Sequence, residues 1–98
     1  MAEYKLNTRE IEALLEELRK EQDDPDKKAE YNRMRLALKQ MLEQAVTAAK
    51  GALGDAKSAL EFAPEHLKEE YEEKRAEAQK RLDVLTAQYD EAKEKYAF

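Results

Sequence analysis

EFAPEHL, residues 61–67, is the stretch that decides the fold, because it interrupts two long segments built from strong helix formers. Proline pushes the residue before it out of the α region, and proline itself suits the first turn of a new helix. Ala63-Pro64 is therefore predicted to end one helix and begin another. We expect the chain to reverse there as a helical hairpin.

An apolar stripe at helical spacing runs along each segment that flanks this break. Upstream it follows Tyr31, Met34, Leu38, Met41, Ala45, Ala48 and Ala52, and it is widened by Leu42, Ala49, Leu53, Ala56 and Leu60. Downstream it follows Leu67, Tyr71, Ala78, Leu82, Leu85, Tyr89, Ala92 and Tyr96. These stripes predict helices over residues 25–62 and 64–97. A reversal at Ala63 pairs Leu38 with Tyr89 and Tyr31 with Tyr96.

Two glycines offer another place for the reversal. Gly51 and Gly54 each cost roughly 1 kcal/mol inside a helix, and Gly54-Asp55 could end one helix and cap the next. A turn there would leave residues 82–96 without an intramolecular partner. We therefore favour the turn at 63, with a break of the 25–62 helix at 51–55 as the alternative.

A shorter helix is predicted at the N-terminal end, over residues 8–22. Asn7 and Glu10 have the spacing of a capping box, in which each side chain bonds the other residue's backbone N–H. Ile11, Leu14, Leu15 and Leu18 then form one apolar stripe. Asp24-Pro25 stops this helix, and Asp24 is placed to cap the next one.

Length decides how these helices assemble. The first helix would be only about 21 Å long at 1.5 Å per residue, so it can cover one end of the hairpin alone. The sequence thus predicts an all-α fold in a single domain, residues 1–98. It is an antiparallel hairpin of two long helices with a short N-terminal helix packed on one end, which makes that end a three-helix bundle.

The amino-acid composition argues against several classes of partner. Ala, Glu, Lys, Leu and Arg make up 63 of the 98 residues, cysteine is absent, and the net charge is −5. This balance disfavours nucleic-acid binding, because a phosphate backbone would be repelled on average. The sequence lacks an apolar run long enough to span a membrane and a signal-peptide pattern, so we expect a soluble, cytoplasmic chain without membrane partners.

No residue pattern points to catalysis. His66 is the only histidine, and a di-metal bundle site needs such residues on facing helices. The glutamate run, Glu69, Glu70, Glu72 and Glu73, points around the helix circumference and is typical of a solvated face. We therefore expect neither enzyme activity nor a metal or other cofactor.

The expected function lies in an interaction surface. The first helix is too short to reach the far half of the hairpin, so an apolar strip should stay exposed there, and such strips usually mark interaction sites. It comprises Ala45, Ala48, Ala52, Leu53, Leu60, Leu67 and Tyr71. We expect it to bind a helix of a protein partner or of a second copy in a homodimer.

In its sequence pattern the chain resembles a computationally designed helical bundle. The resemblance rests on Asp24-Pro25-Asp26, on Ala63-Pro64-Glu65-His66 and on the string LKEEYEEKRA, residues 67–76. Gly51 and Gly54 depart from that pattern. The resemblance implies an idealised scaffold or designed binder. The alternative is a small natural acidic protein, such as a phage-type or bacterial inhibitor or assembly protein, that binds a cellular protein target.

Overall fold

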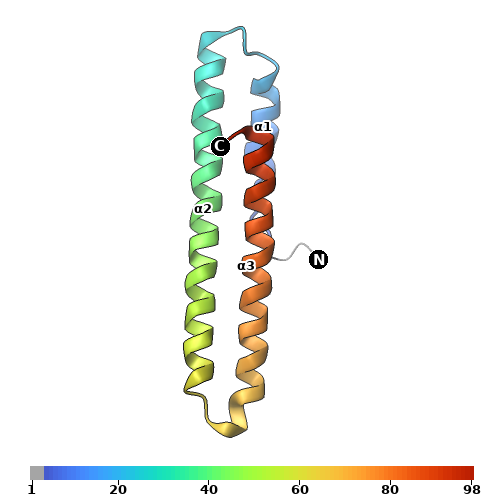
Figure 1. The fold of residues 1–98 in the computed structure, drawn as a ribbon. Helices are drawn as coiled ribbons and strands as arrows, with labels where there is room; N and C mark the ends of the chain where they lie inside the picture. The colour runs from blue at the N-terminus through green and yellow to red at the C-terminus, as the bar shows by residue number, and fades with distance from the viewer. Residues whose placement is uncertain (1–3) are drawn as a thin grey trace.

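A computed structural model describes residues 4–98, and in this part of the chain it contains helices and no strand. In chain order the helices are α1 (Arg9–Arg19), α2 (Pro25–Glu61), the short 3-10 helix η1 (Glu65–Leu67) and α3 (Lys68–Tyr96). The described chain is 84% helical. Figure 1 shows α2 and α3 as a long antiparallel hairpin with α1 beside one end. The predicted all-α three-helix architecture is confirmed.

The start of α1 differs from the predicted capping box. The Arg9 amide donates to Oδ1 of Asn7 at 3.3 Å, so Asn7 does cap a first-turn N–H. The helix itself begins one residue later than predicted, with Thr8 as its N-cap. Glu10 consequently sits at the second helical position instead of the third, and within the described residues it makes no reciprocal bond to Asn7.

α1 also ends three residues before the predicted limit of 22. Its last turn tightens, because the amides of Lys20 and Glu21 donate to the carbonyls of Glu17 and Leu18, three residues back. The side-chain amide of Gln22 donates to the Leu18 carbonyl at 2.7 Å. These bonds satisfy the carbonyls of Glu17 and Leu18 in the last turn, after which the chain turns toward α2.

α2 is one continuous helix of 37 residues. Asp24 caps it as predicted, accepting a hydrogen bond from the Asp26 amide at 2.9 Å, with Pro25 in the first turn. Gly51 and Gly54 lie within the helix, and neither has a positive φ angle. The reversal therefore occurs at the proline break, and the alternative turn at the glycines is wrong.

α3 begins at Lys68, four residues after the predicted start at 64. Pro64 is extended, with φ −60° and ψ 150°, and the next three residues form η1. The Leu67 amide donates to the Pro64 carbonyl at 2.9 Å and closes this 3-10 turn. Extended proline followed by a 3-10 turn uses one helical turn of sequence before α3 starts.

The later start shifts the alignment of the two long helices. The Tyr89 hydroxyl donates to Glu43 at 3.4 Å, whereas the predicted partner of Tyr89 was Leu38. The Arg35 guanidinium donates to the carbonyls of Tyr96 and Ala97 at 3.3 and 3.0 Å. Each α3 residue therefore faces α2 about one turn later than predicted.

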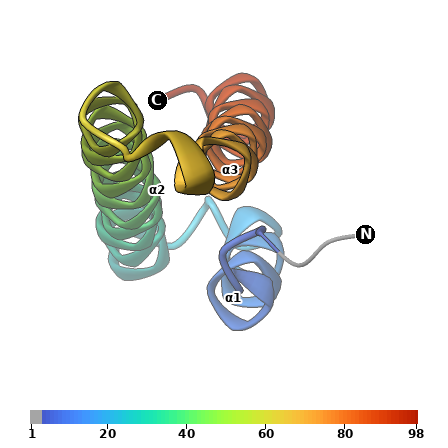
Figure 2. The same cartoon turned by 90° about the horizontal axis from the view of Figure 1, so that it is seen from below.

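The hydrophobic core follows the seam between the helices. Its largest cluster lies at the end that α1 covers, and Leu15 of α1 is fully buried there. The other buried members of that cluster are Leu38, Leu42, Ala92 and Tyr96. Toward the hairpin tip the seam continues as a two-helix contact through Ala49 and Leu53. Figure 2, along the helix axes, shows α1 against one flank of the α2 and α3 pair.

Candidate interaction surface

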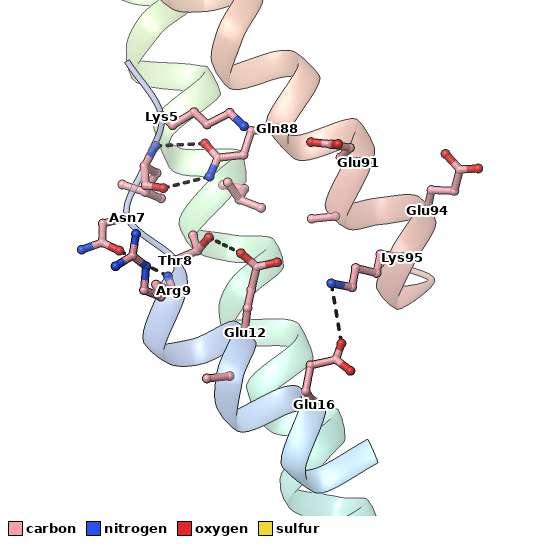
Figure 3. Close-up of a pocket in the computed structure, with 14 residues that line it drawn as sticks. Lys5, Asn7, Thr8, Arg9, Glu12, Glu16, Gln88, Glu91, Glu94 and Lys95 are labelled. Carbon is pink, nitrogen blue, oxygen red and sulfur yellow. Dashed lines mark hydrogen bonds and ion pairs between the residues drawn. The ribbon is translucent and has the colours of Figure 1, made fainter. Parts of the chain in front are cut away.

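A groove of about 850 Å³ separates α1 from α3, and polar side chains bridge it. Gln88 holds the segment before α1 by two bonds: its Oε1 accepts from the Leu6 amide at 2.9 Å, and its Nε2 donates to the Leu6 carbonyl at 2.8 Å. Figure 3 shows this pair and the ion pair of Lys95 with Glu16 at 3.6 Å. Side chains of this same chain therefore bridge the groove and hold its two walls together.

Tyr96 is the aromatic centre of this contact. It is 2% exposed, and its hydroxyl donates to a Glu12 carboxylate oxygen at 3.3 Å. The Arg19 guanidinium lies 5.5 Å from the Tyr96 ring centroid, and Arg19 also donates to the Lys95 carbonyl at 2.8 Å. Burial raises the pKa of Tyr96, and the Glu12 carboxylate adds to this shift. These contacts attach α1 to the C-terminal end of α3.

Titratable groups elsewhere do not converge. His66 lies exposed in η1 at the hairpin tip. Between residues 4 and 98, no group of three His, Cys, Asp or Glu side chains is placed to hold a metal ion. The same stretch has no buried side-chain nitrogen or oxygen without a hydrogen-bond partner.

The predicted apolar strip is divided between two surfaces. Ala48 and Ala52 are exposed on α2, and Ala45 is half-buried beside them. Leu53 follows Ala52 directly and so points about 100° further around the helix. It is only 7% exposed, inside the seam with α3, and is not available to a partner. The strip is therefore not one contiguous surface, and its alanine part is the exposed part.

The remaining residues of the strip follow the seam to the tip. Leu60 lies seven residues after Leu53, on the same helix face, and is half-buried. Leu67, the last residue of η1, and Tyr71, in the first turn of α3, are also half-buried. The Lys74 ammonium lies 5.2 Å from the Tyr71 ring centroid. These three side chains belong to the hairpin's own contact, with their outer edges exposed.

The exposed alanines continue the stripe of α2 that α1 covers. Met34, which packs against the core cluster, begins this stripe, and positions 7, 11, 14, 18 and 25 residues later share its face. Met41 occupies the first of these positions and is 37% exposed. We call the others the alanine row; they are Ala45, Ala48, Ala52 and Ala59.

A row of charged residues lies on the matching face of α3. Counting back from Gln88, the positions 7, 11, 14 and 18 residues earlier share its face. We call them the charged row; they are Arg81, Glu77, Lys74 and Glu70, and all are exposed. The Tyr4 hydroxyl donates to Glu77 at 2.6 Å, so this face lies on the α1 side of the hairpin. The alanine row and the charged row together form what we call the distal flank.

Helix length explains why the distal flank is uncovered. α1 has 11 residues and is about 16 Å long, whereas the 37 residues of α2 extend over about 55 Å. α1 and the residues just before it occupy the flank only at one end. Sequence reasoning identified Ala45, Ala48 and Ala52, but it found neither Ala59 nor the charged row, whose signal is a repeat of opposite charges at helical spacing.

At the hairpin tip, Phe62 is 83% exposed. It is the C-cap of α2, beyond the helix face that meets α3. Leu36, on the side of α2 opposite the seam, is 52% exposed. Leu36 is an isolated apolar residue, which is ordinary on protein surfaces, whereas Phe62 adjoins the end of the distal flank.

Comparison with known proteins leaves the chain without a relative on which to base an assignment. No protein-family model, no curated protein and no solved structure matches it. Within residues 4–98, none of the helices has the length and apolar character required to cross a membrane. The identifiable features are therefore those of the fold, a three-helix bundle with one flank covered along only part of its length.

Proposed function

We propose that this chain is a non-catalytic protein-binding module whose interaction surface is the distal flank. One observation carries the proposal: α1 already packs as a helix on this flank at the other end of the hairpin. The same flank continues past α1 with exposed Ala48 and Ala52 and without a covering helix in the described chain. A helix from another protein could occupy it along the same line.

The residue types support binding in place of chemistry. Alanine side chains let a partner helix approach closely, and the charged row supplies a polar rim with both signs of charge. The chain has no cysteine, and its one histidine is exposed at the tip. A partner helix with small or apolar residues on one edge and charges on the other suits this flank.

The proposal has two forms that differ in origin. In the first, the chain is a designed scaffold or binder, as the idealised helix starts suggest. In the second, it is a small natural acidic inhibitor or assembly protein of phage or bacterial type that binds a cellular target. A melting temperature above about 90 °C would favour design, and a value in the ordinary range of mesophilic domains would favour natural origin.

The test immobilises three versions of the chain, the unmodified one, Ala52→Glu and Ser58→Glu, and compares which proteins each version retains. Ala52→Glu places a carboxylate in the middle of the alanine row and is expected to abolish capture of proteins that the unmodified chain retains. Ser58→Glu adds the same charge on the back of α2, where Ser58 is exposed, and should leave capture unchanged.

Far-UV circular dichroism should show equal helicity in all three baits. Binding is then measured again, with purified protein, for each protein that only the Ala52→Glu bait fails to retain. Equal binding by all three baits would show that the distal flank is not the interaction surface.

A further inference from the structure

The charged row of α3 alternates in sign along the chain: Glu70, Lys74, Glu77 and Arg81. Its inner members have partners already, because Lys74 lies over the Tyr71 ring and Glu77 accepts from the Tyr4 hydroxyl. Its outer members, Glu70 and Arg81, make no hydrogen bond or ion pair within residues 4–98. Two opposite charges thus lie exposed at the two ends of one helix face.

Such a row is complementary to itself when one copy is reversed. In an antiparallel arrangement Glu70 of each copy faces Arg81 of the other, and Lys74 faces Glu77. A parallel arrangement would place like charges together, which is unfavourable. The antiparallel arrangement has two-fold symmetry, so every contact occurs twice, as in the isologous interfaces of most homodimers.

The same symmetry axis also aligns the alanine row. It crosses α3 midway between Glu70 and Arg81, at residues 75–76. The bonds from Tyr89 to Glu43 and from Arg35 to the Tyr96 carbonyl fix how α2 and α3 are aligned. With this alignment, residues 55–56 of α2 lie beside residues 75–76 of α3. Reversal about that level brings Ala52 to within a residue of Ala59 in the other copy. Small side chains at this crossing let the two α2 helices approach closely.

We infer that the partner of the distal flank is a second copy of this chain, docked antiparallel to form a four-helix bundle around the two hairpin tips. This inference rests on the proposed function of the flank and names its occupant. The overlap covers residues 48–63 of α2, about 24 Å; both α1 helices lie outside it, and the Tyr4 hydroxyl, bonded to Glu77, lies within it. It brings the exposed Phe62 of one copy to within a residue of Ala48 in the other.

A short, partly charged interface gives a weak dimer, so the experiment is sedimentation equilibrium over about 10 µM to 1 mM protein at low salt. The unmodified chain is expected to shift from monomer toward dimer in this range. Arg81→Glu places two glutamates together at both symmetric sites, and it should weaken the dimer at least tenfold. The double variant Glu70→Arg with Arg81→Glu restores opposite charges and should recover dimerisation.

Lys57→Glu is the matched control, because it makes the same charge change at an exposed position on the other flank of α2. It should leave the dimer unchanged. A chain that stays monomeric at every concentration, or an Arg81→Glu variant that dimerises normally, would overturn the inference. A double variant that stays monomeric while keeping its helicity would overturn it too. The bait experiment with Ala52→Glu measures binding of other proteins independently, so loss of the homodimer alone would leave the proposed function of the flank standing.

Discussion

Gln88 joins the N-terminal segment to α3 through both functional groups of its side-chain amide. One amide oxygen and one amide nitrogen meet the backbone N–H and carbonyl of Leu6, much as a neighbouring strand would. The contact is part-buried, and Leu6 packs against the core cluster beside it. This side chain therefore fixes where the segment before α1 lies.

Substituting Gln88 by alanine should lower the free energy of unfolding by about 1–2 kcal/mol, because two net hydrogen bonds are lost. The Leu6 amide should also exchange with solvent faster. Urea denaturation and hydrogen exchange measure these two effects. Gln79→Ala is the control, since Gln79 bonds only the exposed Asp83 one turn away on the same helix. A Gln88→Ala variant as stable as that control would contradict the assigned role.

Tyr96 predicts a loss of stability at alkaline pH. Burial, with the Glu12 carboxylate beside it, raises the pKa of Tyr96 above its ordinary value of 10.0. The unfolded chain then releases this proton before the folded chain does. The stabilisation is fully present below pH 10 and is lost as the pH rises through the higher pKa of the folded state.

The measurement is chemical denaturation at a series of pH values from neutral to strongly alkaline. The Tyr96→Phe variant should show a shallower decline in stability than the unmodified chain, because its side chain cannot ionise. The chain has four other tyrosines, so the pKa of Tyr96 is taken from the difference in tyrosinate absorbance between the folded unmodified chain and the folded Tyr96→Phe variant. Parallel declines in both proteins would show that Tyr96 does not contribute to the alkaline transition.

At the scale of elements, α2 passes through two glycines without a break. Neither has a positive φ, and a Cβ added at Gly51 or Gly54 would meet nothing within 4 Å outside its own helix turn. Two glycines so close together favour a turn, but packing of α2 against α3 on both sides of them keeps the helix continuous. Propensity is a weak preference that tertiary contacts override.

Replacing Gly51 or Gly54 by alanine should therefore raise the free energy of unfolding by about 0.5–1 kcal/mol each. The gain comes mainly from the smaller conformational entropy of the unfolded chain, since alanine fits the helical backbone without strain. Thermal and urea denaturation of the two single variants and the double variant check this. A variant less stable than the unmodified chain would indicate that this part of α2 is not an ordinary helix.

At the scale of the whole molecule, the alignment of α2 with α3 is the quantity to test. Extending the observed cross-helix bonds places Ala49 opposite Leu82, whereas a turn centred at Ala63 places it opposite Ala78. Cysteines introduced at 49 and 82 should form a disulfide within one chain readily, because paired Cα atoms must lie within about 7 Å. Cysteines at 49 and 78 should cross-link much more slowly. Comparable rates for the two pairs would contradict the observed alignment.

Local signals determined much of this protein from its sequence. Asp24 and Pro25 specify the start of α2, because a capping oxygen and a fixed φ act within two residues. The spacing of Leu38 and Leu42 identifies the buried face, because helix periodicity alone decides which side chains share a side. Fold class and the end of the hairpin that α1 covers follow from these signals together with element length.

Contacts between distant residues were decided only by the tertiary structure. The burial of Leu53 and the two bonds of Gln88 depend on where helices far apart in sequence meet. A shift of one helical turn keeps every apolar stripe facing inward, so hydrophobic periodicity cannot distinguish the alternatives. The turn at residues 62–67 and the side chains that cross between the helices decide which alignment forms.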